Sequence, residues 1–167
     1  MFRHQKELQF EAKPDRPNPL IAKYLQELIG GQYGEMSVAM QYLFQGWSCR
    51  GEEKYKDMLM DIATEELGHV EMLATMVARL LEDAPVEDQE EAMKKDPTIG
   101  AIISGMNPQQ AIVAGLGPRP ADSVGNPWSG SYIIASGNLL ADFRANLNAE
   151  SQGRLQVARI YEMIDDR

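Results

Sequence analysis

Apolar residues recur at helical spacing along three long stretches of the chain. They cover residues 20–48, 52–83 and 138–163. Recurrence at three- and four-residue intervals is typical of amphipathic helices that pack against one another. Asn18 precedes a proline at the first helical position, which predicts the start of the first helix. The pattern predicts an all-α bundle in which Gly30-Gly31 weaken the first helix locally without necessarily ending it.

The stretch between the second and third predicted helices, residues 84–135, is interrupted by prolines at 85, 97, 108, 118, 120 and 127. These prolines leave room for short helical pieces near 88–95 and 108–114 only. A connection of this length is typical of a functional or covering segment. We therefore expect an extended arm over residues 1–17 and a helical bundle over 18–167 that contains a long crossover. No segment has the pattern of a paired strand.

Length and charge restrict the functions that this chain can have. Its 167 residues correspond to one domain, and 16 Lys and Arg against 25 Asp and Glu give a net charge of -9. This charge opposes binding to nucleic acid or to an anionic membrane surface. The single cysteine, Cys49, allows no internal disulfide, and the first residues contain no apolar run. These features predict a cytoplasmic protein that neither spans a membrane nor carries a signal peptide.

Each predicted helix carries a glutamate near the middle of its apolar seam. The first seam is Ile21, Leu25, Leu28, Gln32, Glu35, Ala39 and Tyr42; the second is Tyr55, Leu59, Ile62, Glu66, His69, Leu73, Met76 and Leu80; the third is Leu140, Phe143, Leu147, Glu150, Arg154, Val157 and Tyr161. An unpaired carboxylate in an apolar interior is costly, so such groups are normally protonated, paired or bound to metal.

The carboxylates are also expected at similar depths. Glu35 and Glu66 each lie about 14 residues from the turn between the first two helices, or roughly 21 Å along each axis. His69 follows Glu66 by one helical turn, so both side chains point the same way. Carboxylate oxygens and a neutral imidazole suit manganese or iron, and three carboxylates at one level suggest two ions sharing a bridge.

The same residues have simpler explanations. A histidine on a helical seam is more often a satisfied core residue than a ligand. Arg154 could neutralise Glu150 one turn away, and the run from Glu87 to Glu91 fits a solvated face. The methionines fit core filling, and Trp128 is expected to anchor the crossover. Three glutamates predicted at the level of His69 favour the metal site over these alternatives.

Four motifs of the chain resemble those of manganese catalases in the ferritin-like superfamily. They are Gly30-Gly31-Gln32-Tyr33-Gly34-Glu35-Met36, Thr64-Glu65-Glu66-Leu67-Gly68-His69-Val70-Glu71, Trp128-Ser129-Gly130-Ser131-Tyr132-Ile133 and Ala149-Glu150-Ser151-Gln152-Gly153-Arg154. The resemblance extends over nearly the whole chain and keeps the order and spacing of the family. It implies a four-helix bundle, two manganese ions, hydrogen peroxide as substrate and a hexamer.

The resemblance also implies roles for individual residues. Glu35 and His69 would bind one manganese, Glu150 the other, and Glu66 would bridge both. Tyr42 matches a tyrosine beside the ligands, close to the substrate channel. Asp57 and Asp61 match residues that hold calcium in some members, whose other calcium ligands come from a later segment.

One ligand of the family pattern has no counterpart in this sequence. The second manganese needs a histidine on a fourth helix, but the chain contains only His4 and His69. If the fourth helix returns antiparallel to the third, a ligand at the level of Glu150 should follow it by roughly 31 to 34 residues, near 181 to 184. We therefore expect the chain to be the first part of a longer protein, with the fourth helix missing and weak or absent catalysis in this form.

The predicted function is a dimanganese catalase that converts hydrogen peroxide into water and dioxygen and so counters oxidative stress. A di-iron oxidase or ferroxidase is an alternative, because the same bundle and ligand types serve iron. A non-catalytic structural relative of the coat type is a second alternative.

Overall fold

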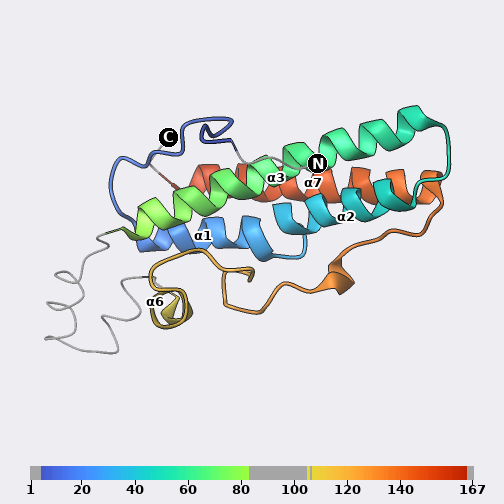
Figure 1. Ribbon diagram of the computed structural model, residues 1–167. Helices are drawn as coiled ribbons and strands as arrows, with labels where there is room; N and C mark the ends of the chain where they lie inside the picture. The colour runs from blue at the N-terminus through green and yellow to red at the C-terminus, as the bar shows by residue number, and fades with distance from the viewer. Residues whose placement is uncertain (1–4, 83–104, 106, 165–167) are drawn as a thin grey trace, which may run out of the picture.

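The computed structural model describes residues 5–82, 105 and 107–164. The helices are α1 (Pro19–Gly30), α2 (Glu35–Ser48), α3 (Glu53–Leu81), α6 (Pro108–Ile112), the 3-10 turn η1 (Gly130–Tyr132) and α7 (Leu139–Met163). The long helices lie side by side along one common direction (Figure 1). Within the described residues the one β feature is an isolated bridge between Ala121 and Pro127, so the all-α prediction is confirmed there. None of the described helices is long and apolar enough to cross a membrane.

The first predicted helix is two helices in the structure. α1 ends at Gly30 and α2 begins at Glu35. A Cβ at Gly30 would clash with the backbone of Ala121, and one at Gly34 would lie 2.8 Å from the carbonyl oxygen of Ile29. The glycines therefore end the helix and also allow close backbone packing. Gln32, predicted on the inner seam, is exposed within this break.

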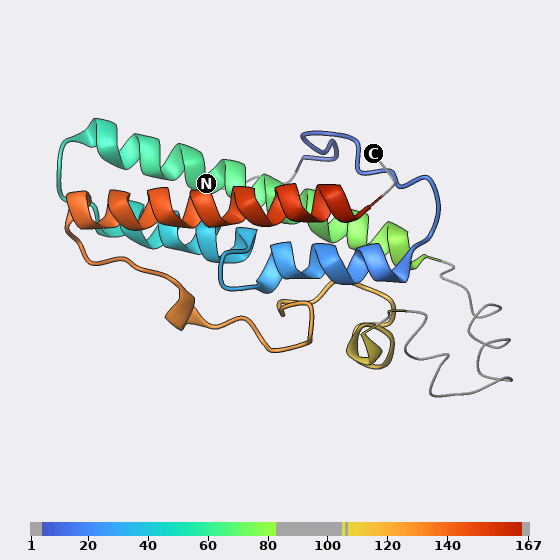
Figure 2. The same ribbon diagram turned by 180° about the vertical axis from the view of Figure 1, so that it is seen from behind.

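α1 and α2 both pack on α3. α3 runs alongside the two helices in turn (Figure 2). One apolar cluster joins the first part of α3 to α2 through Val38, Tyr42, Leu43, Leu59 and Ala63 together with Ala149 of α7. A second joins the last part of α3 to α1 through Ile21, Ala22, Ile29, Val77, Leu80 and Leu81. The seam predicted for this helix is confirmed, since all eight of its members are buried or half-buried.

α7 runs alongside α2 and α1, and most of its predicted seam is exposed in these 167 residues. Leu140, Leu147, Val157 and Tyr161 are exposed, whereas the buried residues are Asp142, Asn146 and Ala149. The face of α7 that contacts α2 therefore carries polar side chains. An apolar period cannot identify such a face, because buried polar groups that form hydrogen bonds leave no apolar signal.

The described part of the crossover lies across α1 and α2. The indole nitrogen of Trp128 donates a hydrogen bond of 2.9 Å to Ser37 Oγ, which confirms the predicted anchor. Gln26 Nε2 donates to the carbonyl oxygens of Arg119 and Ala121, at 2.6 and 2.7 Å. The short helix predicted at 108–114 is α6. The piece predicted at 88–95 and the run from Glu87 to Glu91 lie outside the described residues.

Candidate metal centre

Glu66 and His69 come from consecutive turns in the middle of α3. Because they are three residues apart on a helix, their side chains leave the same face. Glu66 is 6% exposed, and its Oε2 lies 2.8 Å from Nδ1 of the half-buried His69. A buried carboxylate is thus paired with an imidazole nitrogen, as the seam pattern predicts.

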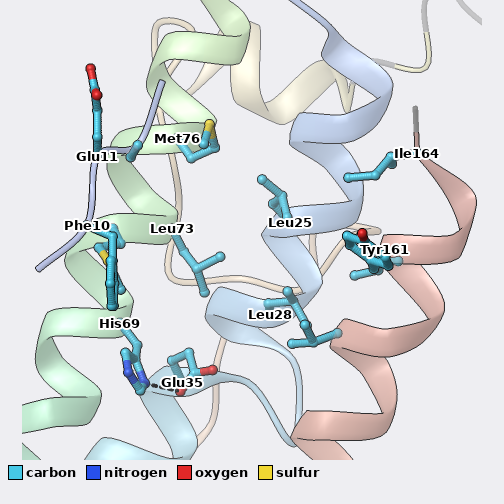
Figure 3. Close-up of a pocket in the computed structure, with 14 residues that line it drawn as sticks. Phe10, Glu11, Leu25, Leu28, Glu35, His69, Leu73, Met76, Tyr161 and Ile164 are labelled. Atoms are coloured by element: carbon cyan, nitrogen blue, oxygen red, sulfur yellow. Dashed lines mark ion pairs between the residues drawn. The ribbon is translucent and has the colours of Figure 1, made fainter. Parts of the chain in front are cut away.

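Glu35 reaches the same point from the first turn of α2. Its Oε2 lies 3.5 Å from His69 Nδ1, and the two side chains point toward one another in Figure 3. One ligand atom from each of Glu35, Glu66 and His69 lies within 4.8 Å of the others. The prediction that Glu35 and Glu66 meet at one level is therefore confirmed. The helix N-terminus also favours negative charge at Glu35.

The close approach of these acids changes the protonation of Glu35. Burial, a hydrogen bond with Glu66, and repulsion from Glu66 and Glu150 raise the pKa of Glu35 from 4.5 to about 9. Without a cation, the Glu35 carboxyl therefore keeps a proton near neutral pH. A divalent ion among two carboxylate oxygens and one imidazole nitrogen would replace this proton and remove the repulsion. The donor set therefore fits a borderline divalent metal such as manganese.

Glu150 approaches the centre from α7 and contacts Tyr42 of α2. The Tyr42 hydroxyl donates a hydrogen bond of 2.9 Å to Glu150 Oε1. Burial and the charge of Glu66 raise the pKa of the Glu150 carboxyl, while the Tyr42 hydrogen bond opposes this shift. Burial and the bond to Glu150 also raise the pKa of the Tyr42 phenol. Glu150 is more exposed than the other three and is not part of their cluster.

Several other predicted site residues are not brought to this centre. Asp57 and Asp61 are exposed on α3, and no described side chain completes a group of three metal-ligand residues with them. The calcium site therefore stays a prediction. Within the described residues Arg154 forms no ion pair with Glu150, which instead accepts from Tyr42. His4 lies outside the described residues.

An apolar pocket of about 450 Å³ leads to Glu35 and His69. In Figure 3 this space is surrounded by Leu25 and Leu28 of α1, Leu73 and Met76 of α3, Tyr161 of α7, and Ile164 just after α7. Phe10 of the N-terminal arm also lines it. The sequence gives no sign of this role for the arm, because a single aromatic residue in an extended segment has no periodicity. Apart from Glu11, Glu35 and His69, the residues that line this pocket are mainly apolar.

The raised pKa of Glu35 predicts how the stability of the metal-free protein depends on pH. Between 4.5 and about 9 the folded protein keeps a proton on Glu35 that the unfolded chain releases. The free energy of unfolding should therefore fall as pH rises through this range. Urea unfolding at several pH values measures this slope, and Glu35→Gln should make it shallower. An equally steep slope in Glu35→Gln would contradict the assignment.

Comparisons with known proteins agree with this geometry. The family model described as manganese containing catalase matches residues 1–167. The chain is 72% identical over 167 residues to a manganese catalase of Bacillus subtilis, covering 100% of this chain and 61% of that protein. It is 48% identical over 166 residues to a manganese catalase of Lactiplantibacillus plantarum, covering 99% of this chain and 62% of that protein.

A solved structure gives the same result for the fold. The crystal structure of wild-type KatB, a manganese catalase from Anabaena, matches with a TM-score of 0.81 and 34% identity, over 100% of this chain and 68% of that chain. This match confirms the predicted ferritin-like helical fold. The chain spans about 61% of the length of the Bacillus subtilis relative. With the family model matching residues 1–167, the chain belongs to the manganese catalase family.

Proposed function

We propose that this protein disproportionates hydrogen peroxide to water and dioxygen with two bound manganese ions. The observation that supports this most strongly is the approach of Glu35, Glu66 and His69 to within 4.8 Å in a chain of this family. Bound manganese would supply the redox chemistry, in which one peroxide is oxidised to dioxygen and a second is reduced to water. The side chains of this protein would hold the ions and control the protons.

Glu35 and His69 would hold one ion, Glu150 the other, and Glu66 would contribute to both. His69 would offer Nδ1 as its ligand atom, because this ring nitrogen faces Glu66 and Glu35 at 2.8 and 3.5 Å. Glu35 must lose the proton that it carries in the metal-free protein. Binding should therefore release a proton, and the apparent affinity for manganese should rise with pH.

Tyr42 would orient the carboxylate of Glu150. Its phenol keeps the proton, because burial and Glu150 raise its pKa, and the hydroxyl donates a hydrogen bond to Oε1 of Glu150. This leaves Oε2 free to face an ion. The apolar pocket beside Glu35 and His69 would admit a small neutral molecule such as peroxide more readily than a charged reductant.

Other parts of the proposal follow from the family resemblance. We place the protein in the cytoplasm and in a homo-oligomer, with a hexamer as the expected form. The second histidine ligand, expected near 181 to 184, stays a prediction. The division into an arm over residues 1–17 and a bundle over residues 18–167 also stays a prediction. So does weak or absent catalysis by these 167 residues alone.

An oxygen electrode combined with metal analysis tests the proposed function. The chain extended to the length of its relatives should evolve one dioxygen for every two peroxides consumed when it is loaded with manganese. Iron in clear excess after purification without added metal, with ferroxidase turnover and no dioxygen, would instead support the di-iron oxidase. No dioxygen from the manganese-loaded protein, and no ferroxidase turnover, would indicate a structural relative.

A further inference from the structure

Three buried amide side chains form a hydrogen-bonded network between α2 and α7. Gln41, Gln45 and Asn146 are 4%, 2% and 2% exposed. Asn146 Oδ1 accepts from Gln41 Nε2 at 2.8 Å and from Gln45 Nε2 at 2.9 Å. Asn146 Nδ2 donates in return to Gln45 Oε1 at 2.7 Å. Asn146 and Gln45 therefore pair through both atoms of each amide.

The network also includes the crossover. The backbone N–H of Ile134 donates to Gln41 Oε1 at 2.9 Å, and its carbonyl oxygen accepts from Gln45 Nε2 at 2.7 Å. Both N–H groups of the Gln45 amide are thus used. α2 is joined at one buried point to α7 and to the end of the crossover, and a mismatch there would leave polar groups unsatisfied.

α7 has few fully buried apolar residues in the described part of the chain: Ala149 belongs to the cluster of Tyr42 and Leu59, and Leu139 and Phe143 pack against that cluster. The buried residues of α7 are Asp142, Asn146 and Ala149. Asp142 accepts from Ser136 and Gly137, which lie just before the helix, so its bonds are local. Asn146 is therefore the buried polar side chain of α7 that connects it to α2. Apolar packing is non-directional, whereas these hydrogen bonds match particular atoms of α7 to particular atoms of α2.

This register determines where Glu150 lies. Glu150 follows Asn146 by one helical turn, and its Oε1 is 2.9 Å from the Tyr42 hydroxyl. A slide of α7 by one residue would move Glu150 by roughly 1.5 Å along the axis and about 100° around it. The contact with Tyr42 would then be lost. Tyr42 lies between Gln41 and Gln45 on α2, so the amide network and this contact share the same two helices.

We propose that the network of Gln41, Gln45 and Asn146 sets the register of α7 on α2 and thereby holds Glu150 in place beside Tyr42. Asn146 is the positioning residue in this arrangement and acts through Glu150. The inference rests on the proposed function only in assigning a metal to Glu150. Because amides do not titrate, the register is set independently of pH.

An exchange of side-chain lengths tests the network. Gln45→Asn and Asn146→Gln each break the reciprocal pair, whereas the double variant restores the summed length of the two amides. Asn148→Gln is the matched control, because Asn148 is an exposed amide on the same helix. Each variant is examined for manganese affinity and, in the metal-free protein, for the distance between spin labels on α2 and α7.

The labels would be attached at Phe44→Cys and Arg159→Cys, both exposed positions, with Cys49→Ser to leave no other thiol. Position 159 lies roughly 20 Å beyond Asn146 along α7, at ~1.5 Å per residue. Each single variant should shift or broaden the distance distribution and weaken manganese binding by about tenfold or more. The double variant should recover most of both measurements, because it re-forms the reciprocal pair but moves the amide at position 45 away from the Ile134 carbonyl, and the control should change neither.

Two results would overturn the inference. Single variants with unchanged distances and affinity would show that the network does not set the register. Impaired single variants that the exchange fails to restore would show that packing, rather than amide pairing, matters. Glu150→Gln separates this inference from the proposed function. If that variant binds manganese normally, the metal role of Glu150 fails, while the spin-label distances still decide whether the network controls the register.

Discussion

Replacing Glu66 by glutamine should abolish manganese binding while leaving the protein folded. Glu66 is buried, and it contacts His69 at 2.8 Å. Removing one charged partner from a buried cluster costs about 3–5 kcal/mol. A loss of ~3 kcal/mol in binding corresponds to more than about a hundredfold in affinity. Metal analysis after dialysis against a limiting manganese concentration measures the loss, and circular dichroism confirms that the helices remain.

The neighbouring glutamate provides the control for this experiment. Glu65 precedes Glu66 on α3 but is exposed, so Glu65→Gln removes the same charge without removing a ligand. It should bind manganese nearly as well as the unchanged protein. If Glu65→Gln and Glu66→Gln lose manganese equally, general charge rather than coordination would explain binding. If Glu66→Gln keeps its manganese, the assigned centre is wrong.

Replacing Leu59 by alanine should have the largest effect on stability. Leu59 is 0% exposed and packs between α2 and α3 in a cluster with Val38, Leu43 and Ala63. Truncation would leave a cavity, and such changes cost about 2–5 kcal/mol. Urea unfolding of the metal-free protein measures this loss in the free energy of unfolding.

The adjacent residue on α3 is the matched control. Met58 is 42% exposed, so Met58→Ala should change stability by only about 0.5 kcal/mol. Equal losses in the two variants would mean that helix propensity at this place, rather than burial, determines stability. A negligible loss in Leu59→Ala would contradict the assigned core.

The sequence predicted α3 and its chemistry well, because this helix is amphipathic along its whole length. Its period placed Glu66 and His69 on the inner face, and equal distances from the turn placed Glu35 at their level. All three are found together. The level of a side chain along a regular helix can be predicted reliably, because each residue advances the chain by a fixed rise.

The remaining parts of the fold depended on contacts that no local pattern encodes. The break between α1 and α2 requires Gly30 to lie against the backbone of Ala121, which is distant in the sequence. The buried face of α7 is polar at Asp142 and Asn146, so its apolar period gave no indication of this face. Tertiary hydrogen bonds outweighed the local pattern there.

As a result, the four predicted manganese ligands differ in how closely they are grouped. Glu35, Glu66 and His69 form one cluster within 4.8 Å. Glu150 was expected at the same level, yet its residue is exposed, and it accepts a hydrogen bond from Tyr42. The sequence identified this glutamate by its motif, but the amides that position it could be recognised only in the structure.

Anomalous diffraction at the manganese edge tests the central claim most directly. Crystals of the protein grown with manganese should show a strong peak bonded to carboxylate oxygens of Glu35 and Glu66 and to His69 Nδ1. A second peak should lie between Glu66 and Glu150. Manganese bound elsewhere, or no peak at these side chains when the bulk solution is saturated with the ion, would contradict the account.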